Sequence, residues 1–228
     1  MRGLMMDQLI IGSIATNDDF GASIASRDIG VPEKKKIKKS VPFSNIVHDF
    51  SKINGEIYWD ERIIEYVFEM MADSPEQLEE MKTEFSSFVM NVTDEEIHDP
   101  FIPDYHFKGS FDSMEYEDEE HELKTTVSVT FAVYPYKIAN TKTGYPVSIP
   151  VSENRTIYVN NSSAHRITPE IAITGAVRIV YKNGSYAFAD TVVNDPVFSL
   201  AVGSNEFYIE NNSDAESSVY LSFRNEVF

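Results

Sequence analysis

The stretch SPEQLEEMKTEFSSFVMN, residues 74–91, carries the strongest helix signal in the sequence. Ser74 can cap the helix, Pro75 suits its first position, and Gln77 can complete a capping box. Apolar residues recur at helical spacing and share one face, while the glutamates and Lys82 lie on the other. The apolar face consists of Leu78, Met81, Phe85, Phe88 and Val89. Its burial stabilises the fold by roughly 10 kcal/mol at most, at about 1.5–3 kcal/mol for each side chain.

The sequence on both sides of this helix predicts strands. Residues 65–70 and 126–131 place apolar side chains at every second position, which is typical of a strand with one buried face. We interpret residues 8–14 as a first strand, residues 17–21 as a turn, and Asn54-Gly55 as the centre of a hairpin. A lone amphipathic helix among strands must bury its apolar face on a sheet, which predicts an α+β domain.

The C-terminal part of the chain predicts strands alone. Residues 139–150, ANTKTGYPVSIP, lose the alternation and gather turn-forming residues, so we place the domain boundary there. Beyond it, turn signals such as Asn183-Gly184 separate seven short apolar stretches: RTIYV, EIAIT, AVRIVY, SYAFAD, PVFSL, NEFYIE and SVYLSF. The predicted fold is mainly β with one helix (α+β). A β-sandwich-like domain with a single packed α-helix spans residues 1–138, and a small antiparallel β-sandwich spans residues 139–228.

The composition excludes several kinds of protein. With 19 basic and 37 acidic residues, the 228-residue chain has a net charge of −18, which argues against unaided binding to nucleic acid or an anionic membrane. There is no cysteine, and therefore no disulfide, thiolate metal site or cysteine nucleophile. Residues 1–21 make a poor signal peptide, and no run approaches the roughly 20 apolar residues of a membrane span. We therefore expect no glycans at the Asn-x-Ser/Thr triplets.

Two segments of opposite charge stand out. Residues 34–39 contain five lysines, which we interpret as a solvated edge rather than a nucleic-acid site, because no aromatic residues interleave. The acidic residues 115–122 lack the glycine turn of a calcium loop, and a solvated hairpin tip does not fix the carboxylate pair of a glycosidase. The two segments could instead meet across a subunit interface. The candidate interface residues are Lys34, Lys35, Lys36, Lys38, Lys39, Glu115, Glu117, Asp118, Glu119 and Glu120.

One short segment has metal-ligand character, through His98, Asp99, Asp104 and His106. Pro100 and Pro103 lie between these residues, so no helical spacing holds them, and we interpret them as turn and strand residues. His165 lies in a turn region, no serine occupies a strand–turn–helix elbow, and no glycine-rich nucleotide loop occurs. We therefore expect no catalytic residues, no metal and no cofactor.

Several segments follow one another in a recognisable order. The first segment runs from Pro42 through Asp49-Phe50-Ser51. It is followed by Gly55, Tyr58 and Arg62, and then by the predicted strand and single helix. The segments IHDPFIPDYHFKGSF, VTFAVYPYKI, ITPEIAIT and GSNEFYIE come after these. In this order they resemble the distal tail proteins of siphophages over most of the chain. Many members carry glycines where this sequence has Phe43, Ser44 and Asn45.

The resemblance implies a structural component of a siphophage or prophage tail. Such proteins form a hexameric ring that joins the tail tube protein to the tail-tip protein and the receptor-binding protein or adhesin. Their N-terminal domain forms the ring and their C-terminal sandwich projects outward. The resemblance thus implies a protein of the virion tail tip, made in the cytoplasm of the bacterial host, which is not an enzyme and binds neither nucleic acid nor membrane.

Two alternatives remain open at this stage. The C-terminal sandwich could hold a cell-wall carbohydrate through Tyr181, Tyr186 or Phe188, although these are more easily interpreted as packing residues. Longer relatives carry inserted carbohydrate-binding modules, for which residues 139–228 leave no room. The least favoured alternative is a wall-degrading enzyme that uses Glu117 or Glu119.

Overall fold

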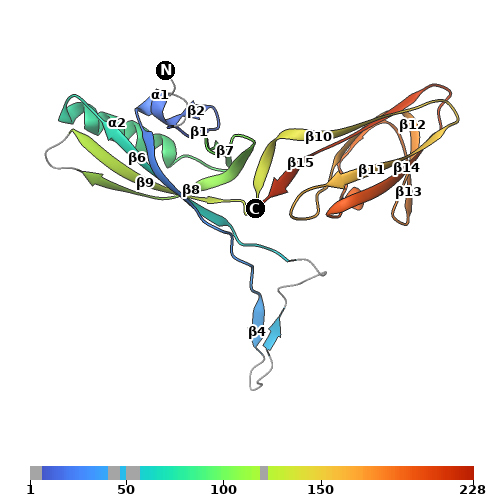
Figure 1. Cartoon of the computed structure of the whole chain (residues 1–228), viewed down its shortest axis with the longest axis horizontal. Coiled ribbons are helices and arrows are strands. Elements are labelled where there is room, and N and C mark those ends of the chain that lie inside the picture. Colours follow the sequence, from blue (N-terminus) through green and yellow to red (C-terminus); the bar gives the residue numbers. More distant parts are fainter. Residues whose placement is uncertain (1–6, 41–46, 50–56, 119–122) are drawn as a thin grey trace. The chain divides into compact units, whose positions relative to one another are not determined.

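The computed structural model describes residues 7–40, 47–49, 57–118 and 123–228, and of residues 39–40 and 47–49 the backbone alone. The chain divides into two compact units, Met1–Lys137 with Phe228, and Ile138–Val227 (Figure 1). Strands dominate both units, and a long helix packs on the sheet of the first, so the mainly-β, α+β fold is confirmed. The predicted hairpin centre Asn54-Gly55 lies outside the described residues.

An antiparallel sheet forms the framework of the first unit, with the strand order β3-β6-β9-β8-β7-β1-β2. The strands are β1 (Ile10–Ile11), β2 (Ile14–Ala15), β3 (Ser23–Ile29), β6 (Arg62–Met71), β7 (Glu95–His98), β8 (Tyr105–Asp118) and β9 (Lys124–Val133). Strands β6 and β9 pair from Arg62↔Val133 to Met71↔Lys124. The helix α2 (Pro75–Val89) connects β6 to β7.

The ends of α2 follow the predicted signals closely. The Ser74 hydroxyl accepts a hydrogen bond from the Gln77 N–H at 3.2 Å, so the predicted N-cap is confirmed. The Gln77 side chain accepts from the N–H of Asp73 at 2.9 Å, one residue earlier than in a capping box. The helix ends at Val89, two residues before the predicted end.

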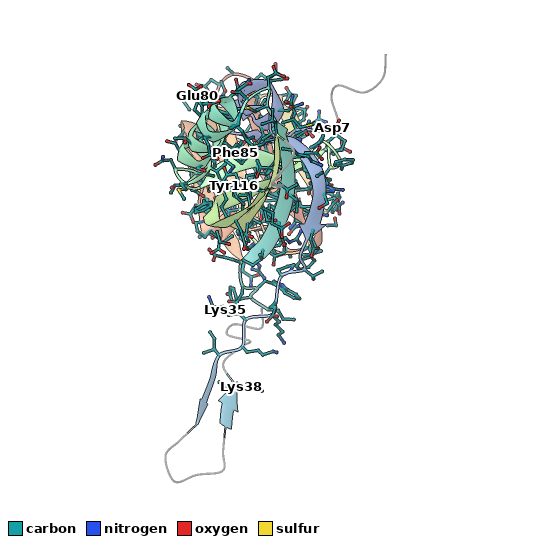
Figure 2. All side chains as sticks on the ribbon, turned by 90° about the vertical axis from the view of Figure 1, so that its left-hand side faces the viewer. Asp7, Lys35, Lys38, Glu80, Phe85 and Tyr116 are labelled. Atoms are coloured by element: carbon teal, nitrogen blue, oxygen red, sulfur yellow. The ribbon has the colours of Figure 1, made fainter. Side chains whose placement is uncertain are left out.

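The apolar face of α2 packs on β6 and its neighbours (Figure 2). Phe85 is fully buried, and its ring lies 5.4 Å from that of Phe68, edge to face. Met81 and Phe88 are only half-buried at the edge of this face. The alternation predicted for β6 and β9 is confirmed, because their inward residues are buried. These are Ile64, Tyr66, Phe68 and Met70 on β6, and Val127, Val129, Phe131 and Val133 on β9.

The N-terminal segment differs from the prediction of one strand and a turn. Strands β1 and β2 form a short hairpin, and a second helix, α1 (Thr16–Phe20), follows directly. The helix ends at Phe20 and is capped by Gly21, which takes the left-handed conformation with φ 67°. The Phe20 ring lies 5.1 Å from that of Phe88, so α1 packs against α2. The prediction of a single helix was therefore wrong, because a one-turn helix is too short to show periodicity. No helix of the described residues is long and apolar enough to cross a membrane.

The second unit is a β-structure in which one strand changes partner. Its strands are β10 (Lys137–Ile149), β11 (Asn154–Asn161), β12 (Glu170–Tyr181), β13 (Gly184–Val193), β14 (Gly203–Asn211) and β15 (Ser217–Val227). Along one edge β12 pairs with β13; along the other it pairs with β15 up to Thr174 and with β14 from Val177. A bulge at Gly175, whose φ of 82° favours glycine, separates the two halves. The β10-β15 and β14-β11 pairs therefore meet at β12 and enclose one core.

Two local predictions in the second unit were wrong. Residues 139–150 were expected to form turns, but most of them belong to β10, which buries Val147 and Ile149. The stretch PVFSL contains the 3-10 helix η2 (Pro196–Phe198) rather than a strand, because the Asp195 side chain caps it. The hairpin predicted at Asn183-Gly184 is present between β12 and β13, and its turn is centred on Lys182 and Asn183, since Tyr181 pairs with Gly184.

Candidate assembly surfaces

The predicted basic segment lies on a two-stranded extension of the sheet, which we call the arm. The arm comprises the described residues 30–40, 47–49 and 57–61. The Lys35 N–H donates to the Tyr58 carbonyl at 2.9 Å, and β4 (Lys38–Ser40) pairs with β5 (Val47–Asp49) further along. Figure 2 shows Lys35 and Lys38 on this extension rather than on the sheet.

The arm is basic and carries exposed apolar side chains. Lys35, Lys36 and Lys38 are exposed and Lys34 is half-buried. Lys35 lies 3.9 Å from Asp60, a surface pair worth less than about 1 kcal/mol; Lys34, Lys36 and Lys38 make no ion pair within the described residues. Apolar side chains are also exposed: Val31, Ile37, Ile57 and Tyr58. Since a two-stranded ribbon is marginally stable alone in water, these side chains suit a contact with another protein surface.

The predicted acidic segment contributes to the sheet face opposite α2. Tyr116 of β8 faces the helix, because its hydroxyl lies 2.9 Å from Ser86 Oγ. Glu115 and Glu117, on either side of it, therefore face away and are exposed. The register places Glu65 of β6 on the same face, and it is exposed as well. We call Glu65, Glu115 and Glu117 the acidic face. Glu119 and Glu120 lie outside the described residues, and so does the side chain of Lys39.

Asp118, another predicted interface residue, is held within the chain. Lys82 Nζ lies 2.7 Å from Asp118 Oδ1, and the Thr125 hydroxyl donates to the same carboxylate at 2.8 Å. These hydrogen bonds hold the pKa of Asp118 below its ordinary value, and the one from Lys82 has the largest effect. The Lys82 side chain is only 11% exposed, so it connects α2 to β8 and does not lie free on the solvent face. Glu115 and Glu117, in contrast to Asp118, make no ion pair within the described residues.

The segment between β7 and β8 is organised around the buried carboxylate of Asp99. Asp99 is 2% exposed, pairs with Arg27, and accepts hydrogen bonds from the Tyr66 hydroxyl at 2.9 Å and the Phe101 N–H at 2.8 Å. The Arg27 guanidinium also lies 4.4 Å from the centre of the Phe101 ring. The pKa of Tyr66 is raised, mainly because the residue is buried and also because the charge of Asp99 lies close to its hydroxyl. Asp99 therefore fixes a turn.

The raised pKa of Tyr66 predicts a specific loss of stability at alkaline pH. The folded chain holds the Tyr66 phenol proton more tightly than the unfolded chain does. The stability that this contributes is fully present below the ordinary pKa of about 10, and it is lost as the pH rises above that value. Tyr66→Phe is expected to cost about 1.5–3 kcal/mol at pH 8. The difference from the unchanged chain should shrink by about 1.4 kcal/mol per pH unit above 10. Urea unfolding at pH 8 to 11 tests this, and a constant difference would contradict it.

The structure brings together two of the predicted metal-ligand residues and adds a third. The register that pairs Ile97 with Phe107 sets His98 of β7 opposite His106 of β8, with ring centres 5.1 Å apart. Glu96, two residues before His98, lies on the same face, and its carboxylate is 3.3 Å from His98 Nε2 and 3.7 Å from His106 Nε2. The candidate ligand atoms of the three residues lie within 4.8 Å of one another. Asp99 and the exposed Asp104 are not part of this group.

The aromatic residues considered for carbohydrate binding pack inside the second unit. The Tyr181 hydroxyl donates to the Ser199 carbonyl at 2.8 Å, and the residue is 3% exposed. The rings of Tyr186 and Phe188 lie 5.0 and 5.8 Å from that of Phe198. A shallow pocket of 450 Å³ does lie beside Tyr181, between the ends of β12 and β14. Its lining includes the exposed Lys182 and the half-buried Tyr208.

Buried asparagines, which were not predicted from the sequence, hold the loops of the second unit. Asn205 belongs to the quoted GSNEFYIE segment; its amide donates to the carbonyls of Ala201 and Gly203 at 2.8 and 3.0 Å. Asn211 donates to the carbonyl of Ile149 at 2.8 Å and accepts from the N–H of Ser213. Both are 6% exposed. Only the position of asparagine next to turn signals could have indicated these roles.

Comparison with known proteins identifies a fold. No protein-family model matches the chain, and no curated protein matches it either. Among solved structures it is similar to the SPP1 Dit (gp 19.1) protein, described as a paradigm of the hub adsorption apparatus in phages that infect Gram-positive bacteria. The TM-score is 0.66 at 12% identity, over 95% of this chain and 98% of that one. The phage P2 baseplate in its activated conformation with Ca is a second match, with a TM-score of 0.40 at 10% identity over 95% and 98%. The chain thus shares the fold of the SPP1 Dit protein.

Proposed function

We propose that this chain is a distal tail hub protein of a siphophage or prophage, a structural component of the virion without catalytic activity. Six copies form a ring that joins the tail tube to the tail-tip protein and the receptor-binding apparatus. The observation that carries the proposal is the fold similarity to SPP1 Dit, with a TM-score of 0.66 over 95% of this chain and 98% of that one. The similarity extends over both units, so it is more specific than a match of one β-sandwich.

The arm and the acidic face supply two different surfaces for the contact between neighbouring copies. A ring requires a head-to-tail contact in which one surface meets another, and the rotation must close. The arm gathers lysines in a chain of net charge −18, and three of them make no ion pair within the described residues. Glu65, Glu115 and Glu117 are exposed on the sheet. We infer that the arm of one copy lies against the acidic face of the next, where charge complementarity sets the register.

Reversing two charges of the arm is expected to weaken the ring. Lys36→Glu with Lys38→Glu should raise the concentration at which hexamers form by at least about 10-fold, since like charges would then face each other. Both side chains are exposed, so the melting temperature of the single chain should stay within about 1–2 °C. Native mass spectrometry at moderate salt measures the assembly, and electron microscopy of the purified protein shows whether a ring of six is present.

The matched control changes the same number of charges away from the arm. Lys142→Glu with Arg155→Glu alters two exposed cations of the second unit and should leave the hexamer unchanged. Adding Glu115→Lys and Glu117→Lys to the arm variant should restore assembly, because the charges are then exchanged. If the arm variant still forms hexamers, the proposed contact between arm and acidic face is wrong, but the proposal of a hub protein stands. Failure of the unchanged protein to form a ring, alone or on tails, contradicts the hub.

A further inference from the structure

We propose that Glu96, His98 and His106 form a binding site for a divalent transition-metal ion of the zinc type. The site lies in the first unit, on β7 and β8, and the argument for it does not depend on the proposed hub. Two imidazoles and one carboxylate are a ligand set that zinc uses with a water molecule in the fourth position.

The sheet, rather than sequence spacing, holds the three ligands together. The pairings Glu96↔Lys108 and Ile97↔Phe107 place His98 directly opposite His106. Ile97 and Phe107 point into the core and are at most 1% exposed, so the register cannot slip without exposing them. His106 is 3% exposed, whereas His98 and Glu96 are 33% and 53% exposed. One ligand is therefore fixed in the interior, and two can adjust at the surface while leaving the ion accessible.

The distances are close to those of a metal site. Zinc ligands lie at about 2.0–2.2 Å from the ion, so their donor atoms are about 3.3–3.5 Å apart in a tetrahedron. The carboxylate of Glu96 is already 3.3 Å from His98 Nε2 and 3.7 Å from His106 Nε2. All three donor atoms lie within 4.8 Å of one another, so a rotation of the partly exposed His98 ring can close the remaining gap.

The chemistry of the group selects a transition metal over calcium or magnesium. Imidazole nitrogen binds zinc, copper and nickel, whereas calcium and magnesium prefer sites made of oxygen alone. Lys108, the register partner of Glu96, is paired with Asp94 at 3.0 Å, which reduces its repulsion of an ion. The carboxylate of Glu96 offsets one positive charge of the ion. The bound ion would tie β7 to β8 beside the turn that Asp99 fixes.

The test uses the full chain, free of any histidine tag, with Zn²⁺ as the probe. Titration calorimetry at pH 7.5 should give one saturable Zn²⁺ per chain. At a free concentration of about 100 times the dissociation constant, the folding equilibrium should shift by about 100-fold, which corresponds to a rise in Tm of roughly 5–10 °C. Co²⁺ should give the visible absorption of a site with nitrogen ligands. Ca²⁺ and Mg²⁺ should produce neither the stoichiometric binding nor the shift.

Variants separate this site from diffuse binding by an acidic chain. His98→Gln and Glu96→Gln change surface residues and should each weaken Zn²⁺ binding by at least about 10-fold. Two controls should keep it: Asp104→Asn, an exposed acid of the adjacent turn, and His165→Gln, whose ring contacts Glu226 at 2.6 Å in the second unit. The proposal is overturned if no saturable Zn²⁺ binding occurs, if His98→Gln binds as tightly as the unchanged chain, or if Ca²⁺ stabilises equally.

Discussion

Phe85→Ala is expected to lower the free energy of unfolding of the first unit by about 3–5 kcal/mol, a typical cost of removing a buried aromatic ring. Phe85 is fully buried, and its ring lies 5.4 Å from Phe68 on β6 and 5.8 Å from Phe20 on α1. It thus joins two helices to the sheet. The cavity cannot collapse easily, because the backbone of the paired strands holds the opposite wall in place.

Urea unfolding measures this loss, with the fluorescence of the single tryptophan, Trp59, reporting on the first unit. Hydrogen exchange of the β6 amides supplies an independent measurement. Phe88→Ala, at a half-buried position of the same helix, should cost clearly less, and Met90→Ala, which is 58% exposed, should cost less than about 0.5 kcal/mol. A loss below about 1 kcal/mol for Phe85→Ala would mean that α2 does not rest on the sheet as described.

Asp99→Ala is expected to destabilise the first unit by a similar amount, about 3–5 kcal/mol, for a different reason. The substitution removes little apolar contact, but it leaves the Arg27 guanidinium and the buried Tyr66 hydroxyl without their acceptor. The Phe101 N–H loses its acceptor as well, so the turn between β7 and β8 should loosen. Asp104→Ala, an exposed aspartate of the same turn, is the matched control and should cost less than about 0.5 kcal/mol.

A double-mutant cycle identifies the interaction responsible. Asp99→Ala and Tyr66→Phe remove the two ends of one hydrogen bond, so the combined loss should be smaller than the sum by about 0.5–3 kcal/mol. Unfolding in urea gives the free energies, and hydrogen exchange in β7 and β8 shows where the loosening occurs. Additive losses would show that the Asp99 carboxylate and the Tyr66 hydroxyl act independently, contrary to their 2.9 Å contact.

Sequence patterns predicted the central elements of the fold because burial there follows a regular period. β6 and β9 have one buried and one open face, and α2 has one apolar face with a capping serine at its start. Helix α1 is too short for its period to be visible, and residues 140–144 of β10, NTKTG, carry no apolar side chain that could show alternation. Its strand character comes from pairing with β15, which is a tertiary effect.

The candidate sites were predicted less well, because they depend on which strands become neighbours. His98 and His106 were not predicted to bind a metal, because the prolines between them prevent a helical spacing. The structure holds them together by strand register instead, and it replaces the two aspartates of the predicted set with Glu96. In the acidic segment, the contact between Asp118 and Lys82 joins residues far apart in the chain, so charge counting could not detect it.

The change of partner along β12 determines where the second unit tolerates added sequence. The β10-β15 pair and the β14-β11 pair both depend on hydrogen bonds to β12. If β12 is interrupted near Gly175, neither pair keeps its complete set of partners. The unit should therefore unfold in one step, and fragments that end at β13 should not fold. Insertions belong at exposed turns that carry no strand hydrogen bonds, such as Lys182-Asn183. A guest domain or affinity tag placed there would leave the shared strand intact.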